Sequence, residues 1–210
     1  MDVFDAMGSC RAMRYLRDEP VSDELIDRLI WAATRAPSPG NSQGWDFVVV
    51  TDAAKRSEIG NALAAAMGPR IEQMLATDAD TDADADRRTL EGALHLATTI
   101  GRAPVLILVC GPVIYPPQRP VESFTWSAIY PAAQNLIVAA RALGLGSVFT
   151  TYHHVVDDVI RHVLEIPDEI RIGALIPVGW PDRAFTPVAR RPITDFIHRD
   201  RWQGDLRRSV

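Results

Sequence analysis

The stretch from residue 126 to 143, WSAIYPAAQNLIVAARAL, is almost entirely apolar, and it limits the possible folds more than any other segment. Its strongly polar residues are Ser127, Gln134, Asn135 and Arg141. A helix that is apolar on every side has no face for water, so it must run through a core or a subunit interface. Pro131 either opens this helix at its first position or kinks it.

Around this segment, runs rich in β-branched residues alternate irregularly with amphipathic stretches. The predicted strands are 47–50, 104–110, 146–151 and 170–179, and the first two are expected to be buried on both faces. The other predicted helices are 23–36, 53–67, 89–101 and 156–164. There is no repeat and no GxGxxG motif, so an α+β sandwich is favoured over a doubly wound sheet. The 210 residues are expected to form one domain, ending in a polar, Pro-bearing arm over 182–210.

Overall composition excludes several classes of protein. The formal charge of −5 argues against nucleic acid as the main partner. Cys10 and Cys110 form no CxxC pair, so neither a disulfide framework nor a zinc site is expected. No basic leader and no charge-free run of about 18 apolar residues is present, so we expect neither secretion nor a membrane span. The expected compartment is the cytoplasm.

The run ATDADTDADADRR, residues 76–88, has the composition of a solvated loop, and 68–88 is predicted to be a mobile lid. A calcium-loop template matches acidic ligands at Asp80, Asp82, Asp84 and Glu91. The position that must turn sharply holds Ala85 where that motif needs glycine. The solvated loop is therefore favoured over calcium binding.

No sequence motif for a catalytic triad, a metalloprotease or a Walker loop is present. His153 and His154 are adjacent and would point to opposite faces of a strand, so no metal site is predicted. Two basic clusters stand out instead, CRAMRYLR at 10–17 and ARRP at 189–192. Arginine matches phosphate in a bidentate fashion, but these arginines can equally form surface ion pairs with nearby carboxylates.

Four motifs, spread in order from residue 10 to 202, resemble the flavin-dependent nitroreductase family. The first is CRAMRYLRDEPVSDELIDRLIWAATRAPSPGNSQGWDFVVV, which is similar to the family's Arg-Arg-Ser-x-Arg and Ala-Pro-Ser-x-x-Asn-x-Gln-Pro-Trp signatures. The others are YPAAQNLIVAARALGLGSVFTTY, IPVGWP and ARRPITDFIHRDRW. The resemblance implies a three-layer sandwich with a mixed, mainly antiparallel sheet, assembled as a homodimer that holds FMN at its interface.

The same resemblance assigns the basic residues to the FMN phosphate. Arg11 and Arg14 match the first motif, and Arg190 and Arg191 match the family's C-terminal basic pair. Two positions depart from the pattern, because Cys10 replaces the leading arginine and Ala12 the serine. A further change puts Gly44 where the family has proline.

The loop RAPSPGNSQGW either only connects a helix to a strand or binds a flat, polar ligand. The resemblance favours ligand binding, with Pro37, Ser38 and Asn41 along the isoalloxazine and Thr150 or Thr151 as donor to flavin N5. Fixed donors at the ring stabilise its reduced form. Trp45 is expected to anchor the core.

The implied activity is a ping-pong oxidoreductase in which NADH or NADPH reduces the flavin and a small nitroaromatic or quinone-like acceptor reoxidises it. No side-chain acid or base is needed, since the flavin carries the hydride. The alternatives are an FMN-binding or storage protein without turnover, and a dehalogenase-like or flavin-fragmenting member of the same scaffold.

Overall fold

The computed structural model describes residues 1–77 and 84–202. In chain order the α-helices are α1 Val3–Ser9, α2 Asp23–Ala33, α3 Ala53–Thr77, α4 Asp84–Thr99, α5 Glu122–Ala142 and α6 Asp157–Leu164. The strands are β1 Asp46–Val50, β2 Val105–Pro112, β3 Gly146–Ser147 and β4 Ile170–Gly179. Short 3-10 turns occur at η1 Pro39–Asn41, η3 Ile100–Arg102, η4 Tyr152–Val155 and η5 Ile193–Asp195.

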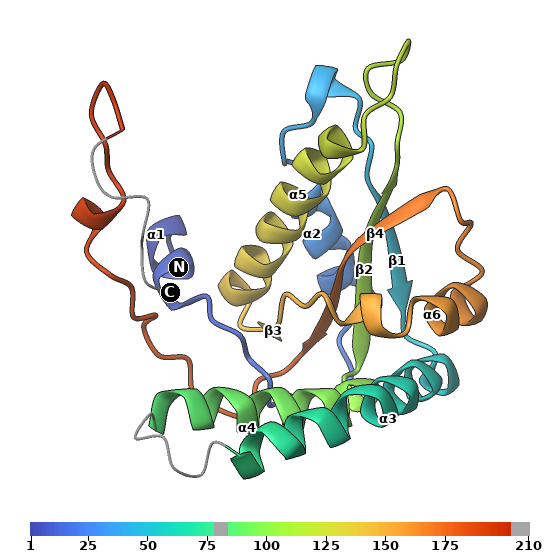
Figure 1. The fold of residues 1–210 in the computed structure, drawn as a ribbon, viewed down its shortest axis with the longest axis vertical. Helices are drawn as coiled ribbons and strands as arrows, with labels where there is room; N and C mark the ends of the chain where they lie inside the picture. The colour runs from blue at the N-terminus through green and yellow to red at the C-terminus, as the bar shows by residue number, and fades with distance from the viewer. Residues whose placement is uncertain (78–83, 203–210) are drawn as a thin grey trace.

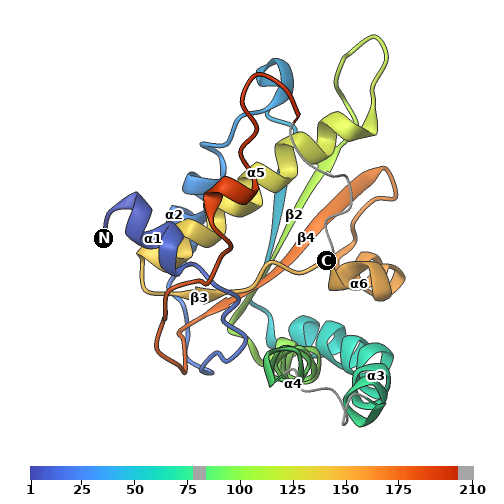
Figure 2. The same ribbon diagram turned by 60° about the vertical axis from the view of Figure 1, so that its left-hand side comes forward.

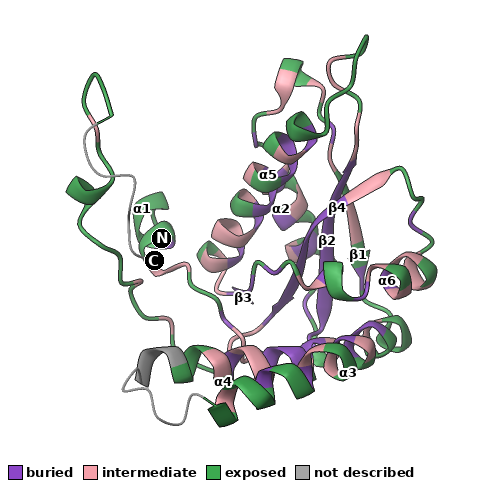
Figure 3. Ribbon diagram, in the orientation of Figure 1, coloured by how far each residue is buried: buried purple, intermediate pink, exposed green. Residues whose placement is uncertain are grey.

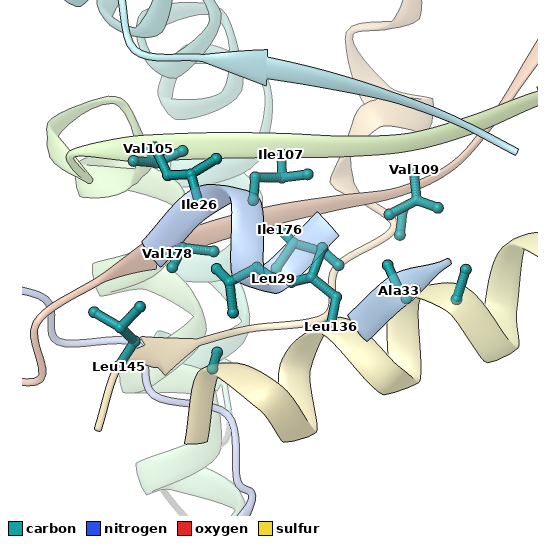
Figure 4. Packing of buried hydrophobic residues seen from close by; sticks show 14 of the residues in the cluster. Ile26, Leu29, Ala33, Val105, Ile107, Val109, Leu136, Leu145, Ile176 and Val178 are labelled. Atoms are coloured by element: carbon teal, nitrogen blue, oxygen red, sulfur yellow. The ribbon is translucent and has the colours of Figure 1, made fainter. Parts of the chain in front are cut away.

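The four strands form one antiparallel sheet in the order β1-β2-β4-β3, with helices on both faces (Figure 1). Alternate residues of β2 divide between two cores, because successive side chains of a strand point to opposite faces. Ile107 packs with α2 and α5 on one side, as Figure 4 shows. Leu108 packs with α3, α4 and α6 on the other. The α+β three-layer sandwich expected from the sequence is therefore confirmed.

The central strands follow the sequence expectation more closely than the edges do. Strands β2 and β4 are buried almost throughout, as the purple ribbon in Figure 3 shows. The prediction that 47–50 is buried on both faces is wrong, because β1 is an edge strand and Val49 is 38% exposed. Only the first two residues of 146–151 form a strand, and Thr150 adds an isolated bridge to Leu175.

The helix predicted over 53–67 continues to Thr77, through Pro69. Residues 68–77 and 84–88, expected as a lid, are therefore helical, while 78–83 lie outside the described residues, as do the proposed calcium ligands Asp80 and Asp82. Helices α3 and α4 pack against each other beneath the sheet, and Ile71 is buried, so tertiary packing outweighs the lost hydrogen bond at Pro69.

Helix α2 begins where the sequence indicates, with the Ser22 hydroxyl accepting a hydrogen bond from the Leu25 backbone N–H at 3.4 Å. Helix α5 begins at Glu122, so Pro131 lies inside it and does not open it. Residues 182–202 form an exposed arm with one 3-10 turn, and the arm stands away from the sheet (Figures 1 and 3).

His153 lies in η4 and is fully buried, and among the described residues neither ring nitrogen has a well-aligned hydrogen-bond partner. Burial first, and the neighbouring His154 second, lower the pKa of His153 from 6.5 to about 4. The nearby Ile172 backbone opposes the lowering of its pKa without cancelling it. The unfolded chain therefore takes up a proton near pH 6.5, whereas the folded chain does so only near pH 4. The free energy of unfolding must then fall as the pH falls through this window.

We expect this one residue to remove up to about 3 kcal/mol of stability between pH 6.5 and pH 4. His153→Leu should flatten that part of the profile of unfolding free energy against pH, measured by urea denaturation, whatever it does to stability at pH 7. The exposed His162→Gln is the control and should keep the wild-type slope. An unchanged slope in His153→Leu would assign the acid sensitivity to other groups.

Candidate active site

The two ends of the chain lie side by side and run in opposite directions. The backbone N–H of Arg17 donates to the Trp180 carbonyl at 2.8 Å, and that of Val188 donates to the Gly8 carbonyl at 2.9 Å. The N-terminal segment is also tied to the sheet edge, since the Met13 N–H donates to the Ser147 carbonyl at 3.0 Å. This ladder brings the two basic clusters of the sequence together.

Arg11, Arg14 and Arg190 line a single cleft of about 400 Å³. The Arg11 guanidinium donates to the Thr186 hydroxyl on the arm, which fixes one of its edges. Among the described residues, neither Arg11 nor Arg14 lies within ion-pair distance of a carboxylate. The ion-pair alternative therefore finds no support at these positions.

Arg191 does not join the other three. It lies over the ring of Phe196, with 4.6 Å from its guanidinium carbon to the ring centroid. It is not among the residues that line the cleft. The structure therefore separates the C-terminal basic pair, with Arg190 directed to the cleft and Arg191 engaged on the arm.

A larger cleft of about 910 Å³ shares Arg11 and Arg14 with the first and extends to helix α4. Gly92 forms part of the α4 wall, where a β-carbon would come 3.1 Å from Cδ of Arg14. The missing side chain thus leaves room for Arg14 to lie along the helix. Arg88 and Arg183 are further residues of this cleft.

Tyr15 and Arg183 of the larger cleft belong to a three-membered stack that sequence reasoning did not predict. The Arg183 guanidinium lies 3.3 Å from the centroid of the Tyr15 ring, and Tyr15 stacks on His95 at 4.1 Å. Burial, followed by the charges of Arg183 and Arg102, lowers the pKa of His95. The positions 88, 92 and 95 have helical spacing, which was the available signal that they share one face.

The loop that carries Pro37, Ser38 and Asn41 is closed by its own hydrogen bonds. The Ser38 hydroxyl accepts from the Gln43 N–H at 2.9 Å, and the Asn41 N–H donates to the Ser38 carbonyl at 3.0 Å. Gly40 has a φ of 58°, which glycine adopts without strain, and it packs against the Tyr115 ring. Pro37 and Asn41 are exposed.

In one chain this loop lies near the N-terminal end of α5, and the segment 10–17, which carries Arg11 and Arg14, passes near the other end (Figures 1 and 2). Tyr115, the partner of Gly40, packs edge-on against Phe124 in the first turn of α5. At the other end, the Cys10 thiol donates to the Ile137 carbonyl at 3.5 Å. The helix rises about 20 Å between these two contacts. One chain therefore does not bring 37–41 to its own arginines.

The two threonines expected near the flavin differ in their surroundings. Thr150 is 5% exposed, and its hydroxyl donates to the Leu175 carbonyl at 2.7 Å. The hydrogen of its hydroxyl group is therefore already used in a hydrogen bond within the sheet. Thr151 is exposed, and its neighbour Tyr152 lies close enough to Arg14 to feel its charge, although burial still raises the pKa of Tyr152. Of the two predicted donors, the geometry favours Thr151.

Within the described parts of the chain, no group of three or more metal-ligating side chains gathers. His153 and His154 lie in a 3-10 turn, not a strand, and their ring centroids are 4.1 Å apart. The expectation that they point to opposite faces is therefore wrong.

No helix in the described parts of the chain is both long and apolar enough to cross a bilayer. Trp45 packs against the core beside α2 and α5.

Comparison with known proteins agrees with this architecture. The family model described as "Nitroreductase family" matches residues 9–180. A 5,6-dimethylbenzimidazole synthase from Rhodospirillum rubrum is 34% identical over 192 residues, which is 86% of this chain and 82% of that protein. A nitrobenzene nitroreductase from Ectopseudomonas oleovorans is 28% identical over 218 residues, with 92% and 96% covered.

Among solved structures, an iodotyrosine deiodinase bound to FMN and 3-iodo-L-tyrosine superposes with a TM-score of 0.75. The alignment covers 96% of this chain and all of that one, at 21% identity, so it establishes the fold alone. Together with the match to the family model, these results place the chain in the nitroreductase family.

Proposed function

We propose that the protein is an FMN-dependent oxidoreductase that uses NADH or NADPH to reduce a small nitroaromatic or quinone-like acceptor. The observation that carries this proposal is the meeting of Arg11, Arg14 and Arg190, from the two ends of the chain, in one cleft. Guanidinium groups held in this way fit a phosphate monoester, which accepts bidentate hydrogen bonds. When bound, the flavin accepts and donates hydride at N5.

The chain's own residues would bind and orient this cofactor. The three arginines would neutralise its phosphate, and Thr151 would offer a hydrogen-bond donor to its ring. Pro37, Ser38 and Asn41 would supply backbone and amide groups to the ring's polar edge from the far end of α5. A donor near the ring stabilises the added charge of the reduced form. Two free cysteines are consistent with work in the reducing cytoplasm.

Because the loop and the cleft are separated within one chain, a complete site requires two copies. The exposed face of α1, α2 and α5 offers a suitable contact, with Trp31 64% exposed beside a groove of about 380 Å³ that Met7 and Val138 also line. The arm carries exposed apolar side chains as well, such as Ile193 at 72%. Two copies antiparallel along α5 would bring the loop of each to the cleft of the other.

Sedimentation analysis at micromolar concentration should therefore give about twice the 23.2 kDa chain mass. Trp31→Glu removes the indole from this face and puts in its place a carboxylate beside Arg35 that would lose its water at the interface. It should therefore shift the equilibrium toward monomer and lower FMN occupancy with it. Arg70→Glu, on the exposed side of α3, is the matched control and should remain dimeric. A wild-type monomer that still holds FMN would contradict the shared site.

The phosphate assignment predicts a difference between FMN and riboflavin, which lacks the phosphate. Arg14→Ala or Arg190→Ala should each cost about 1.5–3 kcal/mol of FMN binding free energy, because a charge-assisted contact is lost. Riboflavin binding should change little. Arg191→Ala is the control, since Arg191 lies on Phe196 outside the cleft. Equal losses for both ligands, measured by flavin fluorescence titration, would show that the arginines do not bind the phosphate.

The activity itself is tested on the purified, FMN-loaded protein without oxygen. Addition of NADH or NADPH should bleach the visible flavin band, and a nitroaromatic or a quinone should restore it. A yellow protein that is inert to both nucleotides would instead support the storage alternative. A colourless protein that takes up no added FMN would remove both readings.

A second candidate is the flavin-fragmenting reaction, and the 34% identity to a 5,6-dimethylbenzimidazole synthase favours it. The isoalloxazine contains a dimethyl-substituted benzene ring, as the product in that name does. Oxygen admitted to the reduced sample distinguishes the two reactions. Full recovery of the flavin spectrum supports the oxidoreductase, whereas permanent loss of the spectrum with release of a benzimidazole supports the alternative.

A further inference from the structure

The larger cleft contains more positive charge than a cofactor phosphate requires. Arg88 reaches it from α4 and Arg183 from the root of the arm, beyond the shared Arg11 and Arg14. Glu91 is the one carboxylate among its described lining residues, and it pairs with Arg87 at 3.1 Å. Among the side chains that the structure describes, those of residues 1–77 and 87–202, neither Arg88 nor Arg183 has an ion-pair partner.

Arg183 is held in place by contact with an aromatic ring. Its guanidinium carbon lies 3.3 Å from the Tyr15 ring centroid, and Tyr15 in turn stacks on His95. Stacking uses the face of the guanidinium and leaves its N–H edges free, so they can hydrogen-bond a carboxylate or phosphate in the plane. A pre-oriented side chain loses less conformational entropy when the ligand arrives.

The distribution of charge separates two positions in the site. A phosphate monoester carries about −1.5 to −2 at pH 7, and the Arg11, Arg14 and Arg190 cluster matches that charge. Arg88 and Arg183 line the larger cleft only, and neither lines the smaller one. Like charges in a concave site repel each other and raise the local concentration of anions. The lowered pKa of His95, after burial, reflects the same positive field from Arg183.

We propose that Arg88 and Arg183 form a second anion subsite, separate from the phosphate cluster, which binds an anionic group of the reacting substrate. The chemical class is a carboxylate or phosphate attached to the molecule that exchanges electrons with the cofactor. Two sources supply this chemistry: a carboxylate on the acceptor, and the 2′-phosphate that distinguishes NADPH from NADH. The inference rests on the proposed function and specifies the substrate of the same site.

Equilibrium binding tests the subsite without turnover. Isothermal titration of the FMN-loaded protein compares benzoate with benzamide, which have nearly the same shape and differ in charge, and NADP⁺ with NAD⁺. We expect the wild type to bind the more anionic member of at least one pair about tenfold more tightly. Arg88→Gln and Arg183→Gln should reduce that preference to near one and leave the less charged member's affinity unchanged.

The matched control is Arg70→Gln, on the exposed side of α3, which removes the same charge and is not among the residues lining the cleft. It should keep the wild-type preference. Arg183→Lys keeps the charge without the planar fork, so a partial loss there would identify the fork as the binding element. Loss for benzoate alone assigns the subsite to the acceptor, and loss for NADP⁺ alone assigns it to the nucleotide.

Three results would overturn the proposal. The first is a wild type that does not prefer the more anionic member of either pair. The second is an equal loss of preference in Arg70→Gln, which would indicate only a diffuse field. The third is reduced FMN occupancy in Arg88→Gln with substrate preference intact, which would place that residue in the cofactor site. None of these results would contradict the proposed function, because FMN binding and anaerobic reduction by NADH or NADPH are measured separately.

Discussion

The pairing of the two chain ends is the constraint on which the site depends. Residues 8–17 and 180–188 lie against each other through backbone hydrogen bonds, and Met13 ties the N-terminal segment to β3. Backbone pairing sets a fixed register, so a residue of the first motif faces a fixed residue of the arm root. Arginines almost a chain length apart therefore converge on a backbone framework, and the Arg11 hydrogen bond to Thr186 adds a side-chain contact across it.

Helix α5 imposes the second constraint. It is buried on one side against the sheet and α2, and it separates the 37–41 loop from the arginine cleft (Figure 2). A helix of this length is stiff, so thermal motion does not close a gap of about 20 Å. The sequence indicates such a helix from its lack of a polar face, and it leaves open whether a core or an interface covers it. In the structure the sheet covers one side, and Tyr130 stays 43% exposed on the other.

Sequence reasoning succeeds for segments whose burial is uniform and fails where the position in the sheet decides. The alternating contacts of β2 need apolar residues throughout, which composition shows directly. The equally apolar β1 lies at the edge, a fact that depends on strand order and not on its residues. Helix α3 continues through Pro69 because its packing against α4 offsets the backbone hydrogen bond that proline removes. The local sequence around Pro69 does not reveal this packing.

The candidate site divides in the same way. Resemblance to the family identified Arg11, Arg14 and Arg190, and the structure brings these three together. The resemblance did not identify Arg88 or the Tyr15 stack. Their place in the site depends on which face of α4 packs against the paired segments 8–17 and 180–188, and the sequence alone does not give that. Arg191 lies over Phe196 and does not line the cleft, so its assignment to the phosphate stays a prediction that the geometry does not support.

The two departures from the family pattern have different physical consequences. Cys10 turns toward α5, where its thiol donates a hydrogen bond to the Ile137 carbonyl. Burial there raises the pKa of the thiol. An arginine at that position would have to leave this contact to reach the cleft, so its replacement removes a charge from the site without leaving a void there. Ala12 does line both clefts, and its methyl group offers no donor. Relative to the family pattern, the two positions together therefore lack one charge and one hydroxyl donor.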